Sequence, residues 1–421
     1  MTIVDRHQIS FVVLSRQSLD SPFLYASAQI PIHLAKYHKV LFIDPIEESI
    51  LTVLKHPGRV ADILRRVWHS SNPVQKGEKL FALSPAAIFP VGYSNRYLKF
   101  INKQLVLWQI RSAIRKLRLK SIIFLTYQRL DWDYVGKLGE ILSTYHCTDL
   151  FGSFEFSSEE ERRDDVQKEE GLIRKSDIVF ATEKELTELI KGINENTFYL
   201  PNATDYELYS KAALPDTKIA DDLSDIPHPI VGFVGIIAEI NVDFSVLEYA
   251  ARNRPQWSFV MIGPMREPEF IPRLKNIYYI GPRRKEEIPH YLKAFDACII
   301  PNPDNEHCKY AFDVKFFEYL AAGKPVVTGC KPALKDYPDL FYESKDQVEF
   351  VDNLDKALVQ DNPRLVKKRQ EAARENTWDK RVQQMLSIID GKVSNRGCSN
   401  WTARDSKAVM AWNGKGDEGI A

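Results

Sequence analysis

The feature that most constrains the fold is a series of short apolar runs, rich in β-branched residues, that alternate with amphipathic stretches. The first five runs comprise residues 9–14, 40–43, 121–125, 178–181 and 197–200. The next five comprise residues 230–234, 258–262, 277–280, 297–300 and 325–328. Runs of this length between helical segments are typical of parallel strands that are buried on both faces. The sequence therefore predicts an α/β protein with two doubly wound, Rossmann-like sheets.

The length of 421 residues exceeds what one hydrophobic core usually serves. The stretch from about 203 to 228 is rich in Asp, Pro and Ala and has no apolar run, which indicates a connection between domains. We predict one domain over residues 1–203, a second over 204–388, and a mobile tail over 389–421 with little periodicity. Ligands of such folds bind at the carboxyl ends of strands, so we expect the site in the cleft between the sheets.

The charge is balanced overall, with 57 basic and 57 acidic residues, which excludes a globally basic nucleic-acid-binding protein. Residues 1–130 nevertheless hold 19 Lys or Arg against 7 Asp or Glu, so an anionic partner is expected for this part.

The spacing of the five cysteines fits neither a disulfide framework nor a zinc site. No run reaches the roughly 18 to 20 apolar residues that a membrane-spanning helix needs. We therefore expect a cytoplasmic protein, soluble or bound peripherally to the inner face of the cell membrane.

The most specific segment runs from Cys298 to Thr328 and leads from a strand through a polar loop into a helix that carries Lys315 and Glu318. Residues three apart share a helix face. An ammonium at a strand-to-helix junction suits a diphosphate, as do free helix amides, and a carboxylate one turn later can accept two hydrogen bonds from a ribose diol. Taken alone, the pair equally fits a solvated ion pair on a helix surface.

This segment closely resembles the C-terminal domain of GT-B glycosyltransferases of the family-four type, particularly bacterial enzymes that build exopolysaccharides and teichuronic-acid-like polymers. In that family the Glu of the FEYLAAGKPVV segment binds the donor ribose, and it corresponds to Glu318. Gly235 and Gly263 match the glycine turns after the first two strands of the donor domain. The resemblance implies a GT-B fold, with two Rossmann-like domains facing each other across a cleft, and hexosyltransferase activity.

Two departures from the family pattern concern the donor site. Tyr310 stands where the family commonly has a second Glu, and Ile236 and Ile237 follow the first glycine turn where an Arg and a Lys often grip phosphate. The candidates for neutralising phosphate are therefore Lys315, Arg283 and Arg284. No Asp-x-Asp motif stands where a diphosphate needs a metal ion, so we expect no metal site and no cofactor, the nucleotide sugar being a co-substrate.

A general base for an inverting transferase is sought in the first domain, where residues 145–149 match a strand-end motif of related polysaccharide enzymes. A carboxylate or an imidazole can take the proton of the acceptor hydroxyl. Asp149 is the first candidate and His146 the second. A retaining enzyme needs no such base, and Asp149 equally fits a helix cap, while His146 equally fits a structural role.

A basic stretch over residues 95–120 contains eight Lys or Arg and no acid, with apolar residues near helical spacing. Basic amphipathic helices of this kind adsorb to anionic lipid headgroups. The residues expected at a membrane or acceptor surface are Trp108, Arg111, Arg115, Lys116 and Arg118. The other reading is a docked, half-buried helix without membrane contact.

These features together predict transfer of a sugar from a nucleotide-sugar donor, UDP- or GDP-linked, to a polysaccharide or lipid-linked acceptor, with no nucleic-acid partner. Two alternatives remain open at this stage. A nucleotide-sugar epimerase with the same fold binds the same donor but needs no acceptor. A non-catalytic scaffold of a polymer-assembly complex is favoured by the departures at Tyr310, Ile236 and Ile237.

Overall fold

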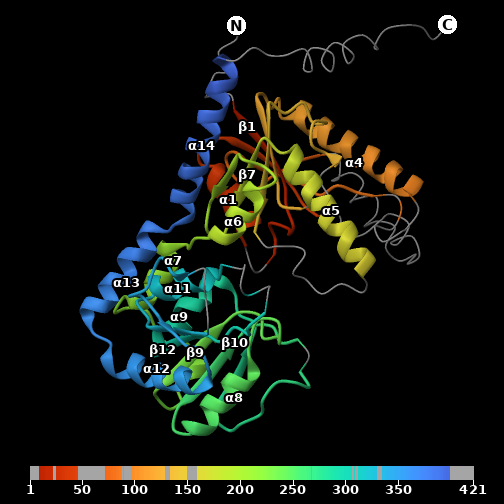
Figure 1. The fold of residues 1–421 in the computed structure, drawn as a ribbon. Coiled ribbons are helices and arrows are strands. Elements are labelled where there is room, and N and C mark those ends of the chain that lie inside the picture. Colours follow the sequence, from red (N-terminus) through yellow and green to blue (C-terminus); the bar gives the residue numbers. More distant parts are fainter. Residues whose placement is uncertain are drawn as a thin grey trace, which may run out of the picture.

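The computed structural model describes residues 9–21, 25–45, 72–87, 89, 96–128, 133–148, 159–266, 268–305, 308, 312–329 and 334–398. Two sheets dominate the described part of the chain, one in each predicted half (Figure 1). The predicted α/β class is confirmed, since all ten apolar runs coincide with strands.

The first sheet has the order β3-β4-β2-β1-β5-β6-β7-β8. Its strands are β1 (Ser10–Leu14), β2 (Lys39–Ile43), β3 (Val74–Gln75), β4 (Leu80–Leu83), β5 (Ile122–Thr126), β6 (Leu142–Cys147), β7 (Ile178–Ala181) and β8 (Thr197–Tyr199). All neighbours are parallel except the β3–β4 pair. We had predicted neither β3 nor β4, and only the end of β6. The polar residues of β6 hide its burial pattern, yet all six are buried, and Thr144 satisfies its hydroxyl by donating to Phe124 O (3.0 Å).

Helices cover both faces of the first sheet. Alternate residues of β1 show the two faces, because Phe11 and Val13 join one core cluster while Val12 and Leu14 join another. The first face is covered by α1 (Ala26–Leu34), and the second by α4 (Arg96–Lys116). Two further helices, α5 (Glu159–Lys175) and α6 (Lys184–Lys191), cover β6 and β7.

The second sheet is fully parallel, in the order β11-β10-β9-β12-β13-β14. Its strands are β9 (Ile230–Val234), β10 (Ser258–Ile262), β11 (Ile277–Gly281), β12 (Ala297–Ile300), β13 (Val326–Thr328) and β14 (Tyr342–Glu343). One face packs against α8 (Phe244–Asn253) and α12 (Gln347–Gln360), and the other against α9 (Ile288–Ala294) and α11 (Val314–Ala321). The chain order reverses at β9 and β12, so their carboxyl ends form the expected binding edge.

The connection between the sheets is partly helical, with α7 (Tyr206–Tyr209) and short turns at Ser210–Ala213 and Asp221–Leu223. The chain returns through α13 (Pro363–Glu375) to α14 (Trp378–Cys398). The two crossings lie side by side, since Thr204 N donates to Asn376 O (3.0 Å) and Trp378 N to Thr204 O (3.3 Å).

The last helix, α14, packs against the first domain rather than the second (Figure 1). Trp378, Val382, Met385 and Ile389 are buried in the core of that domain. The helix continues to Cys398, so the structure differs from the expected mobile tail from 389, because apolar residues of α14 beyond Arg381 dock on α1 and the sheet. Residues 399–421 lie outside the described residues. No helix in the described ranges is long and apolar enough to cross a membrane.

Candidate functional site

Three glycine turns meet at the carboxyl edge of the second sheet. Gly235 N donates to Ile262 O (2.9 Å), and Gly263 N donates to Gly281 O (3.0 Å). A Cβ on Gly263 would lie 1.9 Å from Gly235 O, so no side chain fits there. The backbones of the turns after β9 and β10 are therefore in direct contact, and only glycine fits at position 263.

The start of α11 lies against the first of these turns. Tyr319 of α11 accepts a hydrogen bond from Val234 N (2.8 Å), which ties the helix to the end of β9. Lys315 Cε would lie 3.2 Å from a Cβ on Gly235, and Lys315 Nζ lies 5.5 Å from the ring centroid of Phe233. Asp313, at the N-cap of α11, makes no side-chain hydrogen bond to the described amides of the helix. An ammonium and the helix amides thus stand together, which is a favourable arrangement for an anion.

Glu318 lies one turn further along α11 and is partly buried. Burial raises the pKa of its carboxyl above the usual range, while a hydrogen bond from Tyr209 and the charges of Lys285 and Lys315 oppose this rise. Burial also raises the pKa of the Tyr209 hydroxyl well above its ordinary value. The carboxylate of Glu318 is therefore surrounded by the hydroxyl of Tyr209 and the ammonium groups of Lys285 and Lys315, and can accept hydrogen bonds from a ligand.

Lys285 belongs to this cluster, although the sequence analysis had singled out its two neighbours. Lys285 Nζ lies 3.2 Å from Asp205 Oδ2 and 5.9 Å from the ring centroid of Tyr209. The chain has three basic residues in a row at 283–285, and their spacing alone did not tell which of them faces the site.

Arg283 and Arg284 are engaged elsewhere. Arg283 pairs with Asp222 (2.8 Å) and donates to the Tyr291 hydroxyl, so it fastens the interdomain connection to α9. Arg284 pairs with Glu287 (3.2 Å) at the start of a short helix, and its side chain is 77% exposed. The structure thus brings Lys315, Glu318, Gly235 and Gly263 together and gives both arginines carboxylate partners within the protein.

Asp313, directly before α11, is a second carboxylate of the site that the sequence analysis missed. Its Oδ1 lies 2.7 Å from Lys315 Nζ, and its Oδ2 accepts a hydrogen bond from Asn302 Nδ2 (2.9 Å). Asn202 of the first domain donates through Nδ2 to Phe312 O (2.9 Å), so both domains meet beside Asp313. Only their positions in the sequence could have identified these two residues as part of the site, since Asn302 follows β12 and Asp313 precedes α11.

Of the two expected catalytic residues of the first domain, the structure describes His146, and it is not part of this cluster. His146 lies in β6, is 1% exposed, and packs its ring 5.2 Å from that of Tyr127. Burial lowers the pKa of its imidazole to about 3. Asp149 and Tyr310 lie outside the described residues. Ile237 is buried in the core of the second domain, so one of the two residues after the glycine turn serves packing.

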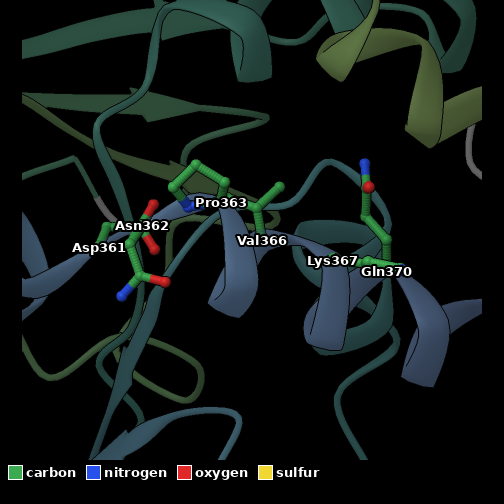
Figure 2. A pocket seen from close by; sticks show the side chains of 6 residues that line it. All are labelled: Asp361, Asn362, Pro363, Val366, Lys367 and Gln370. Carbon is green, nitrogen blue, oxygen red and sulfur yellow. The ribbon is translucent and has the colours of Figure 1, made fainter.

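A surface pocket of about 410 Å³ lies at the opposite end of α11 (Figure 2). It is lined by Asp361, Asn362, Pro363, Val366, Lys367 and Gln370. Val366 and Gln370 lie near Gly323, which follows the carboxyl end of α11. This pocket is therefore separate from the cluster around Lys315. Within the described ranges, no group of three or more His, Cys, Asp or Glu is placed to hold a metal ion.

The predicted basic helix α4 is docked on one side and exposed on the other. Val106, Ile110 and Ala113 are buried against the first sheet. On the outer side Phe100 is 60% and Trp108 54% exposed, and both lie among the basic residues of the helix.

The basic residues expected at this surface have different environments. Arg111 donates through Nε and Nη2 to Lys137 O (3.0 and 2.8 Å), and Lys116 Nζ donates to Asn72 (2.6 Å). Arg115 and Arg118 are exposed. The docked reading of the helix is thus confirmed for one face, and the membrane reading stays a prediction for the other.

Comparisons with known proteins agree on the class. Residues 245–387 match the family described as glycosyl transferase-like. A Bacillus subtilis (strain 168) protein named as a glycosyltransferase of teichuronic acid biosynthesis, TuaH, is 28% identical over 263 residues. That match spans 58% of this chain and 65% of the length of the relative. The predicted resemblance to glycosyltransferases is confirmed.

Solved structures agree on the fold. Sucrose-phosphate synthase from Thermosynechococcus elongatus has a TM-score of 0.64 at 15% identity and covers 92% of this chain and 99% of its own. HepE of Anabaena, in complex with UDP and glucose, has a TM-score of 0.64 at 14% identity and covers 91% of this chain and 99% of its own. At these identities the likeness concerns the fold, and the fold is GT-B.

Proposed function

We propose that this GT-B protein, whose second domain matches the glycosyl transferase-like family, moves a sugar from a nucleotide-sugar donor to a polysaccharide or lipid-linked acceptor. The observation that carries the proposal is the joint position of Lys315 and Glu318 beside the glycine turns of the second sheet. The ribose binds Glu318, and the diphosphate lies between Lys315 and the amides of α11.

The chemistry follows from these positions. An acceptor hydroxyl attacks the anomeric carbon of the donor, the bond from that carbon to the diphosphate oxygen breaks, and the diphosphate leaves with the electron pair. Lys315 and the amides of α11 stabilise the negative charge that develops on the leaving group. Lys285 adds a second positive charge close to Glu318. The proton of the acceptor hydroxyl passes to a base of the first domain if the enzyme inverts, with Asp149 as the candidate.

A uridine nucleotide is the first donor to test. HepE of Anabaena, which shares the fold along 90% of this chain, has been solved in complex with UDP-glucose. A guanosine nucleotide is the alternative. The name of the Bacillus relative supports an acceptor that belongs to a cell-envelope polymer.

Peripheral membrane attachment through the outer face of α4 is a further part of this proposal. Phe100 and Trp108 are exposed on the helix that also carries the exposed Arg115, which suits a helix that inserts aromatic rings among anionic headgroups. Sedimentation with vesicles of phosphatidylglycerol and phosphatidylcholine tests it. A Phe100→Ser/Trp108→Ser double variant should bind anionic vesicles several-fold more weakly, whereas Phe270→Ser, an exposed residue of the other domain, should bind as the parent does. Equal binding of all three proteins would reject the role of α4.

The activity itself is tested by turnover of UDP-glucose and GDP-mannose with and without bacterial membrane lipid extract. A transferase releases nucleoside diphosphate only when acceptor is present, beyond slow hydrolysis. An epimerase converts the donor without acceptor, and a scaffold consumes none. Release that depends on acceptor and is lost in Glu318→Ala, but kept in the exposed control Glu371→Ala, is the result we expect.

A further inference from the structure

Three charged residues follow one another at the start of α11, and the proposed donor contacts account for only two of them. Asp313 is negative, Lys315 positive and Glu318 negative. In the proposed function Lys315 serves the diphosphate and Glu318 the ribose, and no contact with the donor is assigned to Asp313. A carboxylate beside a diphosphate is repelled by it, so the ligand atoms next to Asp313 have to be neutral hydrogen-bond donors.

Asp313 does not act as a helix cap. Asp243, Asp346 and Asn362 stand at the N-caps of α8, α12 and α13, and each accepts hydrogen bonds from two backbone amides. Asp313 stands at the same position of α11 and makes no such bond. Its two oxygens instead face Lys315 and Asn302. The carboxylate of Asp313 therefore does not satisfy the helix amides, and no hydrogen bond of its own competes there with an anion.

Two buried carboxamide oxygens beside Asp313 have no hydrogen-bond partner among the described residues. They are Oδ1 of Asn302 and Oδ1 of Asn202. The amide nitrogens of both residues are engaged, with Asp313 and with Phe312 O, so the orientation of each carboxamide is fixed by its donor side. Asn202 is 8% exposed. A buried acceptor without a donor lowers stability, and such groups in a native protein usually serve a ligand or an ordered water.

We infer that Asp313 and Asn302 bind hydroxyl groups of the transferred sugar, with Asn202 adding an acceptor from the first domain. This inference rests on the proposed function, because it needs a donor with a sugar beyond the diphosphate. The order sugar hydroxyls, diphosphate, ribose hydroxyls then matches the order Asp313, Lys315, Glu318, which spans about 7.5 Å along a helix axis. When the donor binds, the ammonium of Lys315 leaves the carboxylate of Asp313 and contacts phosphate oxygens. The carboxylate of Asp313 then accepts hydrogen bonds from the sugar hydroxyls.

The test compares nucleoside diphosphates with sugar nucleotides. Isothermal titration measures the dissociation constants of UDP and UDP-glucose, and of GDP and GDP-mannose, for the parent, Asp313→Ala and Asn302→Ala. We expect both variants to lose about tenfold or more of the preference for the sugar nucleotide over its diphosphate, since hydrogen bonds to a sugar are removed. Affinity for the diphosphate alone should stay equal or increase in Asp313→Ala, because Lys315 is released from its partner.

The matched control is Asp346→Ala, which removes an Asp that does cap its helix. It should lower the melting temperature through loss of the cap and leave the sugar preference unchanged. The inference is overturned if both site variants keep the parental preference, or if they weaken diphosphate and sugar nucleotide equally, as a purely structural role predicts. Failure of the parent to bind any diphosphate would instead reject the donor site itself. Should Asp313→Ala not fold, Asn302→Ala carries the test alone.

Discussion

The two sheets share parallel topology, but their carboxyl edges differ in chemistry. At the second sheet the strands end in glycine turns, and charged groups gather there around Lys315 and Glu318. At the first sheet the described ends of β5 and β6 carry Tyr127 and His146, whose polar atoms are buried. The described part of one edge thus holds charged groups, while the described part of the other holds buried rings. This difference supports the proposal that the donor is held mainly by the second domain.

The strongest way to break this comparison is to fill the glycine contact. Gly263→Ala places a Cβ 1.9 Å from Gly235 O, so the two turns have to separate. We expect loss of nucleotide binding and a decrease of about 3 kcal/mol in the free energy of unfolding, measured in urea. Gly391→Ala in α14, where a Cβ meets open space, should instead stabilise the protein by up to about 1 kcal/mol. Unchanged nucleotide affinity in Gly263→Ala would show that the turns do not shape the site.

A smaller but specific effect is expected from the cation of α11. Lys315→Ala should lower the rate of transfer about 100-fold, because the leaving diphosphate loses its nearest ammonium. The control is Lys367→Ala on α13, whose side chain is largely exposed. Steady-state release of nucleoside diphosphate measures both. A loss that appears equally in the two variants, or in neither, contradicts the assignment of Lys315.

The three basic residues at 283–285 test which cations of the second domain contact the donor. Lys285→Ala should weaken UDP affinity about five- to tenfold, since its ammonium stands near Glu318 in the donor cluster. Arg284→Ala should change it less than about twofold, because exposed ion pairs contribute little. Titration calorimetry distinguishes the two. A larger loss of UDP affinity in Arg284→Ala than in Lys285→Ala would instead support phosphate binding by the arginines, as the sequence analysis expected.

The smallest effect on activity is expected at the first sheet. His146→Phe should leave the rate within about twofold of the parent, since the imidazole is buried and neutral. It should change the pH dependence of stability. The native imidazole titrates at about 3, below its ordinary value, so in the window from about 6.5 down to 3 the unfolded chain binds the extra proton.

Lowering the pH through that window therefore destabilises the parent, by up to about 1.4 kcal/mol per pH unit, and this contribution is absent in His146→Phe. Urea unfolding at several pH values measures the difference. A large fall in transfer rate in His146→Phe, with stability unchanged, would make His146 a catalytic base after all.

The fold could be predicted from the sequence because buried parallel strands leave short β-branched runs, as in β9 and β12. The short strands β3 and β4 were not predicted, and only the end of β6 was, through the motif at 145–149. Ser143, Thr144 and His146 are buried polar residues of β6, so this strand has no apolar run. The path of α14 was also not predicted, since an apolar helix face does not say on which of two domains it will dock.

The candidate site was predicted only in its family-like part. Lys315, Glu318 and the glycine turns carried a motif, and the structure brings them together. Lys285, Asp313 and Asn302 carried none, because their roles depend on contacts between residues far apart in sequence, such as Lys285 with Asp205. Arg283 was a reasonable candidate by type, but its partner Asp222 lies 61 positions away and could not be foreseen.

The central claim is that the carboxyl edge of the second sheet binds a nucleoside diphosphate through Glu318 and Lys315. The most direct measurement is the melting temperature of the parent, Glu318→Ala and the exposed control Glu371→Ala with a series of nucleoside diphosphates and their sugars. A ligand that binds the native state raises the melting temperature by mass action. We predict that UDP or GDP raises it for the parent and for Glu371→Ala but not for Glu318→Ala. Stabilisation of all three proteins alike, or of none, would contradict the claim.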